Sequence, residues 1–299
     1  MSAADLAGAR AGAAARVTPA GAGAGRLHRV RVVAREEYRR AIETRWLFAF
    51  TAAFAALVLG LSYFGLAQSR EIGFQGFARV TLSLMNLVLL VVPLTGLLLG
   101  VASLAGSGEN LSLLLAQPVS RGEVLAGKYL GLSAALGVAQ ALGFGGGGLV
   151  IALNAGAGQL PGFVALTLLS LVLGGLSIAV AFAIAARWPD RLKAMSAALL
   201  LWLAMVVAYD LAVLGATALL SGLPLERVLF PALLLNPIDL ARVLVTLAVG
   251  SGALFGPTSA VLVKLFGTTR GVALGLVVLA VQTAVPLWLA ARAFRRRDW

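Results

Sequence analysis

The sequence predicts an all-α integral membrane protein with six transmembrane helices, an N-terminal amphipathic helix and a re-entrant or surface helical segment before the last span. Hydrophobic residues make up 60% of the 299 residues and charged residues only 12%, whereas soluble domains carry about 25% charged residues. This composition excludes an ordinary soluble enzyme and a disordered chain. Six segments are apolar over the roughly 20 residues that a helix needs to cross a bilayer. The predicted spans are residues 46–66, 82–105, 129–154, 163–186, 194–220 and 271–291.

Residues 1–28 are expected to form a disordered, cytoplasmic tail rich in Ala and Gly, and residues 29–299 to form the transmembrane domain. The tail holds His28, the only histidine, and the chain has no cysteine. Such a chain offers no cluster of soft ligands for zinc or copper. We therefore expect it to bind no metal or cofactor of its own.

The segment from residue 29 to residue 45 has the periodicity of an amphipathic helix. Apolar residues recur every three or four positions, and arginines recur every four positions on another face. This pattern is typical of a helix that lies in the headgroup plane, although a solvated helix beside the membrane would show it too. The apolar positions are Val30, Ala34, Tyr38 and Ala41/Ile42, and the basic positions are Arg31, Arg35 and Arg39.

The distribution of basic residues indicates the orientation of the spans. With six spans and both termini in the cytoplasm, 18 of the 24 Lys and Arg residues lie on the cytoplasmic side, as the positive-inside rule requires. A seventh span would move one of the two terminal Arg clusters outside. Trp46, Trp188 and Trp288 fall near predicted span ends, where tryptophans anchor helices at the interface.

The segment between spans two and three is expected to form a short helix closed by Pro118, followed by a second helix that begins at Ser120. Ser120 and Glu123 have the spacing of a capping box, which supports this second start. Residues 122–128 match most of a phosphate-binding loop motif, but Tyr129 stands where the motif requires Ser or Thr, and no strand precedes the segment. The glycines at 145–148 lie in an apolar helix, where they either allow a neighbouring helix to approach closely or kink the span.

Asp210 is the one acidic residue inside a confidently predicted span. An acid at this depth is costly and needs a partner, which must come from another helix because the adjacent Tyr209 faces elsewhere. The sequence leaves two roles open, a structural hydrogen bond and a place on a transport pathway.

Residues 221–270 are expected to form a broken pair of short helices, because glycine, proline, serine and threonine interrupt the apolar stretch at 250–259. Within this segment, Asn236 suits an N-cap, Pro237 the first helical position and Asp239 the first turn. Asp239 can also pair with Arg242 three positions later. The motif is that of a capped outer helix, or of an outer gate or docking surface.

Three stretches resemble type-2 ABC transporter permeases. Residues 113–130, LLLAQPVSRGEVLAGKYL, resemble the cytoplasmic coupling region of that family. Residues 35–46, REEYRRAIETRW, resemble its elbow helix, and residues 235–242, LNPIDLAR, resemble its outer segment before the last span. The resemblance is closest to the NosY-like permeases, which are linked to assembly of the copper centres of nitrous oxide reductase.

The resemblance implies the permease subunit of an ATP-driven transporter in the bacterial inner membrane. It implies a second permease copy, separate ABC ATPase subunits that bind ATP and magnesium, a periplasmic partner protein, and no nucleic acid. The chain itself would not be an enzyme. The implied ATPase-coupling residues are Leu113, Leu114, Pro118, Val119, Arg121, Glu123, Arg187 and Arg191; the elbow residues are Arg35, Tyr38, Arg39 and Trp46; the outer residues are Asn236, Asp239 and Arg242.

Two other functions remain compatible with the residues alone. The first is a stand-alone secondary transporter that uses Asp210. The second is a membrane scaffold without transport.

Overall fold

The computed structural model describes residues 20–69, 75–105, 119–155, 160–219, 226–249 and 257–296. Every regular element within these ranges is helical, and six stretches are long and apolar enough to cross a membrane. They match the six predicted spans, except that the third begins at Arg121 rather than near Tyr129. The spans are Arg45–Tyr63, Ser83–Leu104, Arg121–Leu149, Pro161–Arg187, Arg191–Ala216 and Thr269–Arg295.

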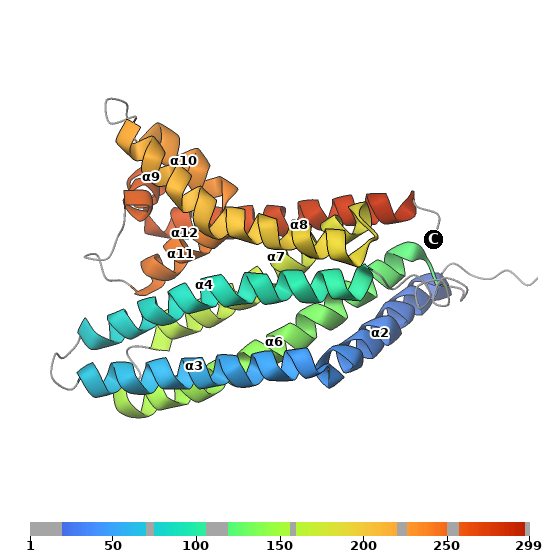
Figure 1. The fold of residues 1–299 in the computed structure, drawn as a ribbon, viewed down its shortest axis with the longest axis horizontal. Coiled ribbons are helices and arrows are strands. Elements are labelled where there is room, and N and C mark those ends of the chain that lie inside the picture. Colours follow the sequence, from blue (N-terminus) through green and yellow to red (C-terminus); the bar gives the residue numbers. More distant parts are fainter. Residues whose placement is uncertain are drawn as a thin grey trace, which may run out of the picture.

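The amphipathic helix α2 (Ala20–Glu43) turns at Thr44 into the first spanning helix, α3 (Arg45–Ser69). Figure 1 shows α2 running at an angle to α3 at one end of the bundle. The helix begins at Ala20, so residues 20–28 are helical and were wrongly assigned to a disordered tail. Residues 1–19 of that tail lie outside the described ranges.

Four helices pack closely, with α7 (Leu160–Arg187) against both α4 (Gln75–Leu104) and α6 (Arg121–Ala155), and α3 against α6. The rings of Phe54, Phe144 and Phe163 lie edge to face, with centroids 5.2 and 5.7 Å apart. A Cβ atom at Gly147 would lie only 2.4 Å from Val58 Cγ1. The predicted role of this glycine run in close helix approach is therefore confirmed.

The fifth span consists of α8 (Arg191–Leu203), a π-helical turn η2 (Ala204–Ala208) and α9 (Tyr209–Leu219). Only 6% of its apolar window is buried within this chain, whereas 61% of the corresponding window of Pro161–Arg187 is buried. The sixth span is also largely exposed, at 11% buried. The last two spans therefore lie on the outside of the bundle, as Figure 1 shows.

Two short helices, α10 (Glu226–Leu235) and α11 (Pro237–Val249), precede the long helix α12 (Pro257–Arg295). We call α10 and α11 the outer hairpin. Leu240, Ala241 and Val245 of α11 are fully buried, and α11 packs against α7, α12 and α4. Two short helices are present, but they meet at Asn236 and not at the predicted interruption, and α11 packs into the bundle rather than lying on its surface. Of the predicted interruption at 250–259, residues 250–256 lie outside the described residues and residues 257–259 form the first turn of α12.

Candidate functional site

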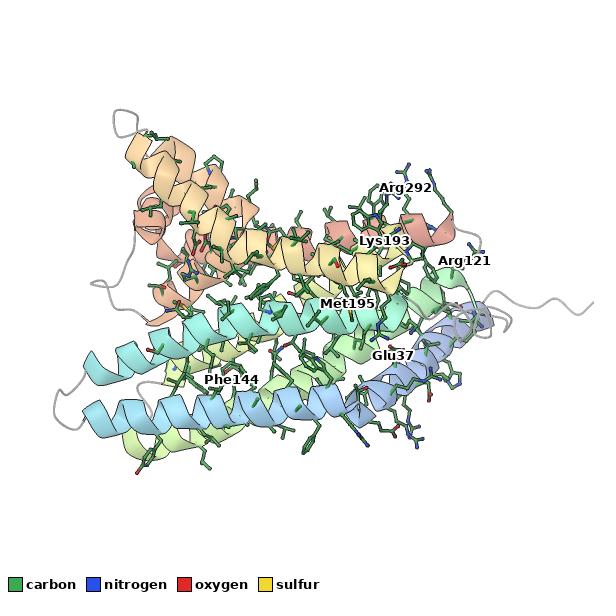
Figure 2. All side chains as sticks on the ribbon, viewed as in Figure 1. Glu37, Arg121, Phe144, Lys193, Met195 and Arg292 are labelled. Atoms are coloured by element: carbon green, nitrogen blue, oxygen red, sulfur yellow. The ribbon has the colours of Figure 1, made fainter. Side chains whose placement is uncertain are left out.

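Charged side chains gather at the end of the bundle where α2, the start of α6, the α7–α8 turn and the end of α12 meet. Figure 2 shows Arg121, Lys193 and Arg292 together there. We call this the basic end, and the end that holds α9 and the outer hairpin the far end.

The start of α6 is fixed by the predicted capping box. Glu123 N donates to Ser120 Oγ at 3.3 Å, and Ser120 N donates to Glu123 Oε2 at 2.9 Å. Glu123 also accepts two hydrogen bonds from Arg29 of α2, one from Nε to Oε2 at 3.1 Å and one from Nη2 to Oε1 at 2.9 Å. This hydrogen bonding raises the pKa of the Arg29 guanidinium. Only 3% of the Glu123 side chain is exposed, so its carboxylate joins α2 to α6.

Arg121 makes a second intramolecular connection at the basic end. Its Nη1 donates to Phe294 O at 3.4 Å and to Arg295 O at 3.2 Å. These carbonyls belong to the last turn of α12, where the helix dipole favours a cation. Arg121 and Glu123 therefore tie the start of α6 to α12 and α2.

Two glycines let α2 lie directly on α6. A Cβ atom at Gly127 would lie 2.6 Å from Val33 Cβ, and one at Gly131 would lie 2.4 Å from Ala34 O. Both distances are shorter than real Cβ contacts, so larger residues would push α2 away. Gly127 of the apparent phosphate-loop motif thus belongs to a helix contact, whereas Gly122 has open space around it.

A buried ion pair lies beside these glycines and was not predicted. Lys128 Nζ donates to Glu37 Oε2 at 2.9 Å, to Ser103 O at 3.1 Å and to Ser103 Oγ at 3.2 Å. Ser103 Oγ in turn donates to Glu37 Oε1 at 2.5 Å. Only 7% of the Lys128 side chain and 11% of the Glu37 side chain are exposed. The pair connects α2, α6 and α4.

The buried face of α2 overlaps the predicted apolar face but is shifted by one position. The most buried positions are Val33, Glu37 and Ala41, of which only Ala41 was predicted, while Val30, Ala34 and Tyr38 are half-buried. The spacing of four between Val33, Glu37 and Ala41 was the available signal. It was missed because a glutamate occupies the middle position.

The remaining predicted residues of the basic end are mostly on the surface. Arg35, Arg39 and Trp46 are exposed, and Tyr38 and Val119 pack partly against the core. Leu113, Leu114 and Pro118 lie outside the described residues.

The α7–α8 turn also presents exposed cations. Arg187 and Arg191 flank it, and the Arg187 guanidinium lies 5.9 Å from the Trp188 ring centroid. Asp190 caps α8 by accepting from Lys193 N at 2.9 Å. The cap fixes the start of α8 and leaves these cations on the surface.

The outer residues form the predicted capped helix start at the far end. Asn236 Oδ1 accepts from Ile238 N at 3.0 Å, and Arg242 Nη1 donates to Asp239 Oδ1 at 2.6 Å. The same Nη1 lies 3.6 Å from Asp210 Oδ2, so Asp210 has the interhelical partner that its position required. Burial raises the pKa of Asp239, and the Arg242 charge opposes that rise. The pairing fits the structural role predicted for Asp210.

Comparison with known proteins identifies the family. Residues 31–299 match the family model described as ABC-2 family transporter protein. A probable ABC transporter permease protein NosY of Pseudomonas aeruginosa is 35% identical over 223 residues, which cover 71% of this chain and 79% of the relative. A protein of the same name from Stutzerimonas stutzeri is 33% identical over 241 residues, which cover 78% of this chain and 87% of the relative. The chain therefore belongs to the ABC-2 transporter family and is a membrane-spanning ABC transporter permease.

Proposed function

We propose that separate ABC ATPase subunits dock at the basic end of this permease and drive its rearrangement. One observation carries the proposal. The start of α6, which follows the family's coupling region, is bonded both to α2 through Glu123 and Arg29 and to α12 through Arg121. A displacement applied at this point reaches spans one, three and six together. ATP and magnesium bind in the partner subunits, and the permease chain hydrolyses nothing.

The basic end faces the cytoplasm of a bacterial inner membrane in this proposal, with both chain termini on that side. The support is the positive-inside rule, since the described part of this end carries most of the basic residues. They are Arg26, Arg29, Arg31, Arg35, Arg39, Arg40, Arg45, Arg121, Lys128, Arg187, Arg191, Lys193, Arg292, Arg295 and Arg296.

The predicted coupling residues divide into two groups. Arg187 and Arg191 are exposed and serve, with Val119 and residues 113–118, as the docking surface for the ATPase. Arg121 and Glu123 are engaged inside the permease, so their role is to transmit the movement.

The docking surface can be tested by pull-down of the ABC ATPase subunit that co-purifies with the wild-type permease. The double variant Arg187→Glu/Arg191→Glu should bind less ATPase, because the surface charge is reversed where the partner sits. Arg270→Glu, near the opposite end of α12, should bind as the wild type does. Equal pull-down by the double variant and the wild type would overturn the proposed docking surface. Uncoupler-sensitive flux by the purified chain alone would instead favour a secondary transporter.

A second permease copy packs against the fifth and sixth spans. This is supported by their exposure, which leaves Leu199, Leu203, Val207 and Leu211 of the fifth span uncovered. The chain contains no cysteine, so Leu203→Cys gives a clean crosslinking probe. We expect disulfide-linked dimers from Leu203→Cys and none from Leu142→Cys, a position on α6 that is also exposed. The reverse would place the dimer interface elsewhere.

The transport system supports copper-centre maturation of nitrous oxide reductase, and a periplasmic partner contacts the outer hairpin. The support is the similarity to two proteins named NosY over most of this chain. Deleting this gene should yield nitrous oxide reductase that lacks copper, and plasmid-borne wild-type gene should restore it. A deletion strain with fully copper-loaded reductase would refute this role.

A further inference from the structure

The π turn of span five changes the hydrogen bonding of the helix backbone. In a regular α-helix, Tyr209 N would donate to Met205 O, four residues earlier. Here Tyr209 N donates to Ala204 O, five residues earlier. Met205 O instead accepts from Asn236 Nδ2, at 2.8 Å, across 31 residues of sequence.

Asn236 uses both ends of its carboxamide. While Nδ2 donates to the π turn, Oδ1 accepts from Ile238 N and caps α11. Asn236 is buried, with 3% of its surface exposed. Only a side chain with both a donor and an acceptor at this reach makes the two contacts, since a carboxylate can only accept and a serine hydroxyl is shorter.

Two further contacts hold the outer hairpin between spans five and six. Arg242 of α11 reaches Asp210 of α9 at 3.6 Å. Gln282 of α12 donates to Leu234 O, near the end of α10, at 2.7 Å. The Asn236 contact also borders a small apolar hollow, which Met205 and Ile238 line together with Pro93 of α4. On the α8 side of the π turn, Trp202 Nε1 donates to Leu90 O of α4 at 3.0 Å, so α8 is held to α4 up to this point.

We propose that Asn236 is a positioning residue for transport, which couples bending of span five at its π turn to movement of the outer hairpin. π turns of this kind are frequent at functional sites, and sharp helix kinks occur at them. Because one amide of Asn236 bonds to both the π turn and the first turn of α11, movement of one element is coupled to movement of the other. The link to transport rests on the proposed function, whereas the mechanical coupling does not.

The test uses variants that separate the two contacts. Asn236→Ser keeps a good N-cap for α11 but does not reach Met205 O. Asn236→Asp also keeps the cap acceptor but cannot donate. Asn236→Ala loses both contacts. Spin labels on Leu211→Cys and Leu235→Cys, which are both exposed, report the distance between α9 and the hairpin in nanodiscs.

For Asn236→Ser and Asn236→Asp we expect a broadened distance distribution and amide exchange at residues 209–210 faster by about three- to tenfold, as loss of one hydrogen bond implies. Exchange at residues 238–240 should match that of the wild type. Unchanged distances and exchange in both variants, with effects in Asn236→Ala alone, would reduce Asn236 to a helix cap and overturn the coupling.

The transport part is measured separately with the ATPase partner present. ATPase stimulation by the permease should fall by about three- to tenfold in Asn236→Ser, with pull-down of the ATPase unchanged. Broadened distances with full stimulation would refute the role in transport and leave the coupling standing. Failure of the wild type to bind any ATPase would refute the proposed function, while the distance measurement would still decide the coupling.

Discussion

Substitution of Lys128 by methionine tests the buried ion pair that joins α2 to α6 and α4. Methionine has nearly the length and the apolar stem of lysine but lacks the ammonium group. In the wild type that group, Lys128 Nζ, lies 2.9 Å from Glu37 Oε2 and 3.2 Å from Ser103 Oγ. Removing one member of a buried pair costs about 3–5 kcal/mol, because the other charge stays buried. At roughly 2–4 °C per kcal/mol for chains of 150–250 residues, this predicts a melting temperature lower by about 6–20 °C.

The size of the loss should depend on which partner is removed. Glu37→Gln should lower the free energy of unfolding by less than Lys128→Met does, because Lys128 keeps the Ser103 carbonyl oxygen at 3.1 Å as an acceptor. The double variant Glu37→Gln/Lys128→Met should lose less stability than the sum of the two single variants, because it leaves no buried charge unpaired.

The melting temperatures of all three variants can be measured on detergent-purified protein, with size-exclusion chromatography used to monitor the loss of folded protein on heating. Lys193→Met is the control and should melt as the wild type does, because Lys193 is exposed and its backbone N, not its side chain, donates to the α8 cap. The reasoning is refuted if Lys128→Met melts with the wild type, or if the double variant loses the sum of the single losses.

The same assay checks two further contacts. Gly131→Ala should destabilise the protein by about 1–3 kcal/mol, because its Cβ would lie 2.4 Å from Ala34 O. Gly122 has open space around it, so Gly122→Ala should stabilise α6 by about 0.5–1 kcal/mol. Similar melting of the two variants would contradict the close approach of α2. Asp239→Asn should cost about 1.5–3 kcal/mol through loss of its charged hydrogen bond, and Asp210→Asn less than about 1 kcal/mol, since Asp210 is 45% exposed and 3.6 Å from Arg242. The opposite order would make Asp210 the main partner of Arg242.

The six spans and the helix starts could be predicted because their determinants are local. A transmembrane span can be recognised from the high hydropathy of about 20 consecutive residues. The caps at Ser120 and Asn236 depend on residues two or three positions away. Both features can therefore be predicted without knowledge of the tertiary structure.

The contacts between helices could not be predicted in the same way. Glu37 and Lys128 are 91 residues apart, and Arg121 is 174 residues from Arg295. A glutamate on a helix with many arginines is usually solvated, and a lysine at the start of a span usually reaches for the headgroups. Only the spacing of four from Val33 and Ala41 distinguishes Glu37 from such residues, and nothing local distinguishes Lys128. Two of the three buried positions of α2 were therefore not predicted.

The two ends of the bundle are fastened by different chemistry, which bears on how each can move. At the basic end, α2, α4 and α6 are joined through buried or bidentate charge pairs, and α2 approaches α6 at two glycines. Such contacts lose much of their strength when the geometry is disturbed, so these helices are suited to move as one body. At the far end, the ion pair between Arg242 and Asp210 is partly exposed and long at 3.6 Å, and single amides of Asn236 and Gln282 hold backbone carbonyls. A hydrogen bond of this kind contributes only about 0.5–1.5 kcal/mol, so bending during a transport cycle should concentrate in the outer half of span five.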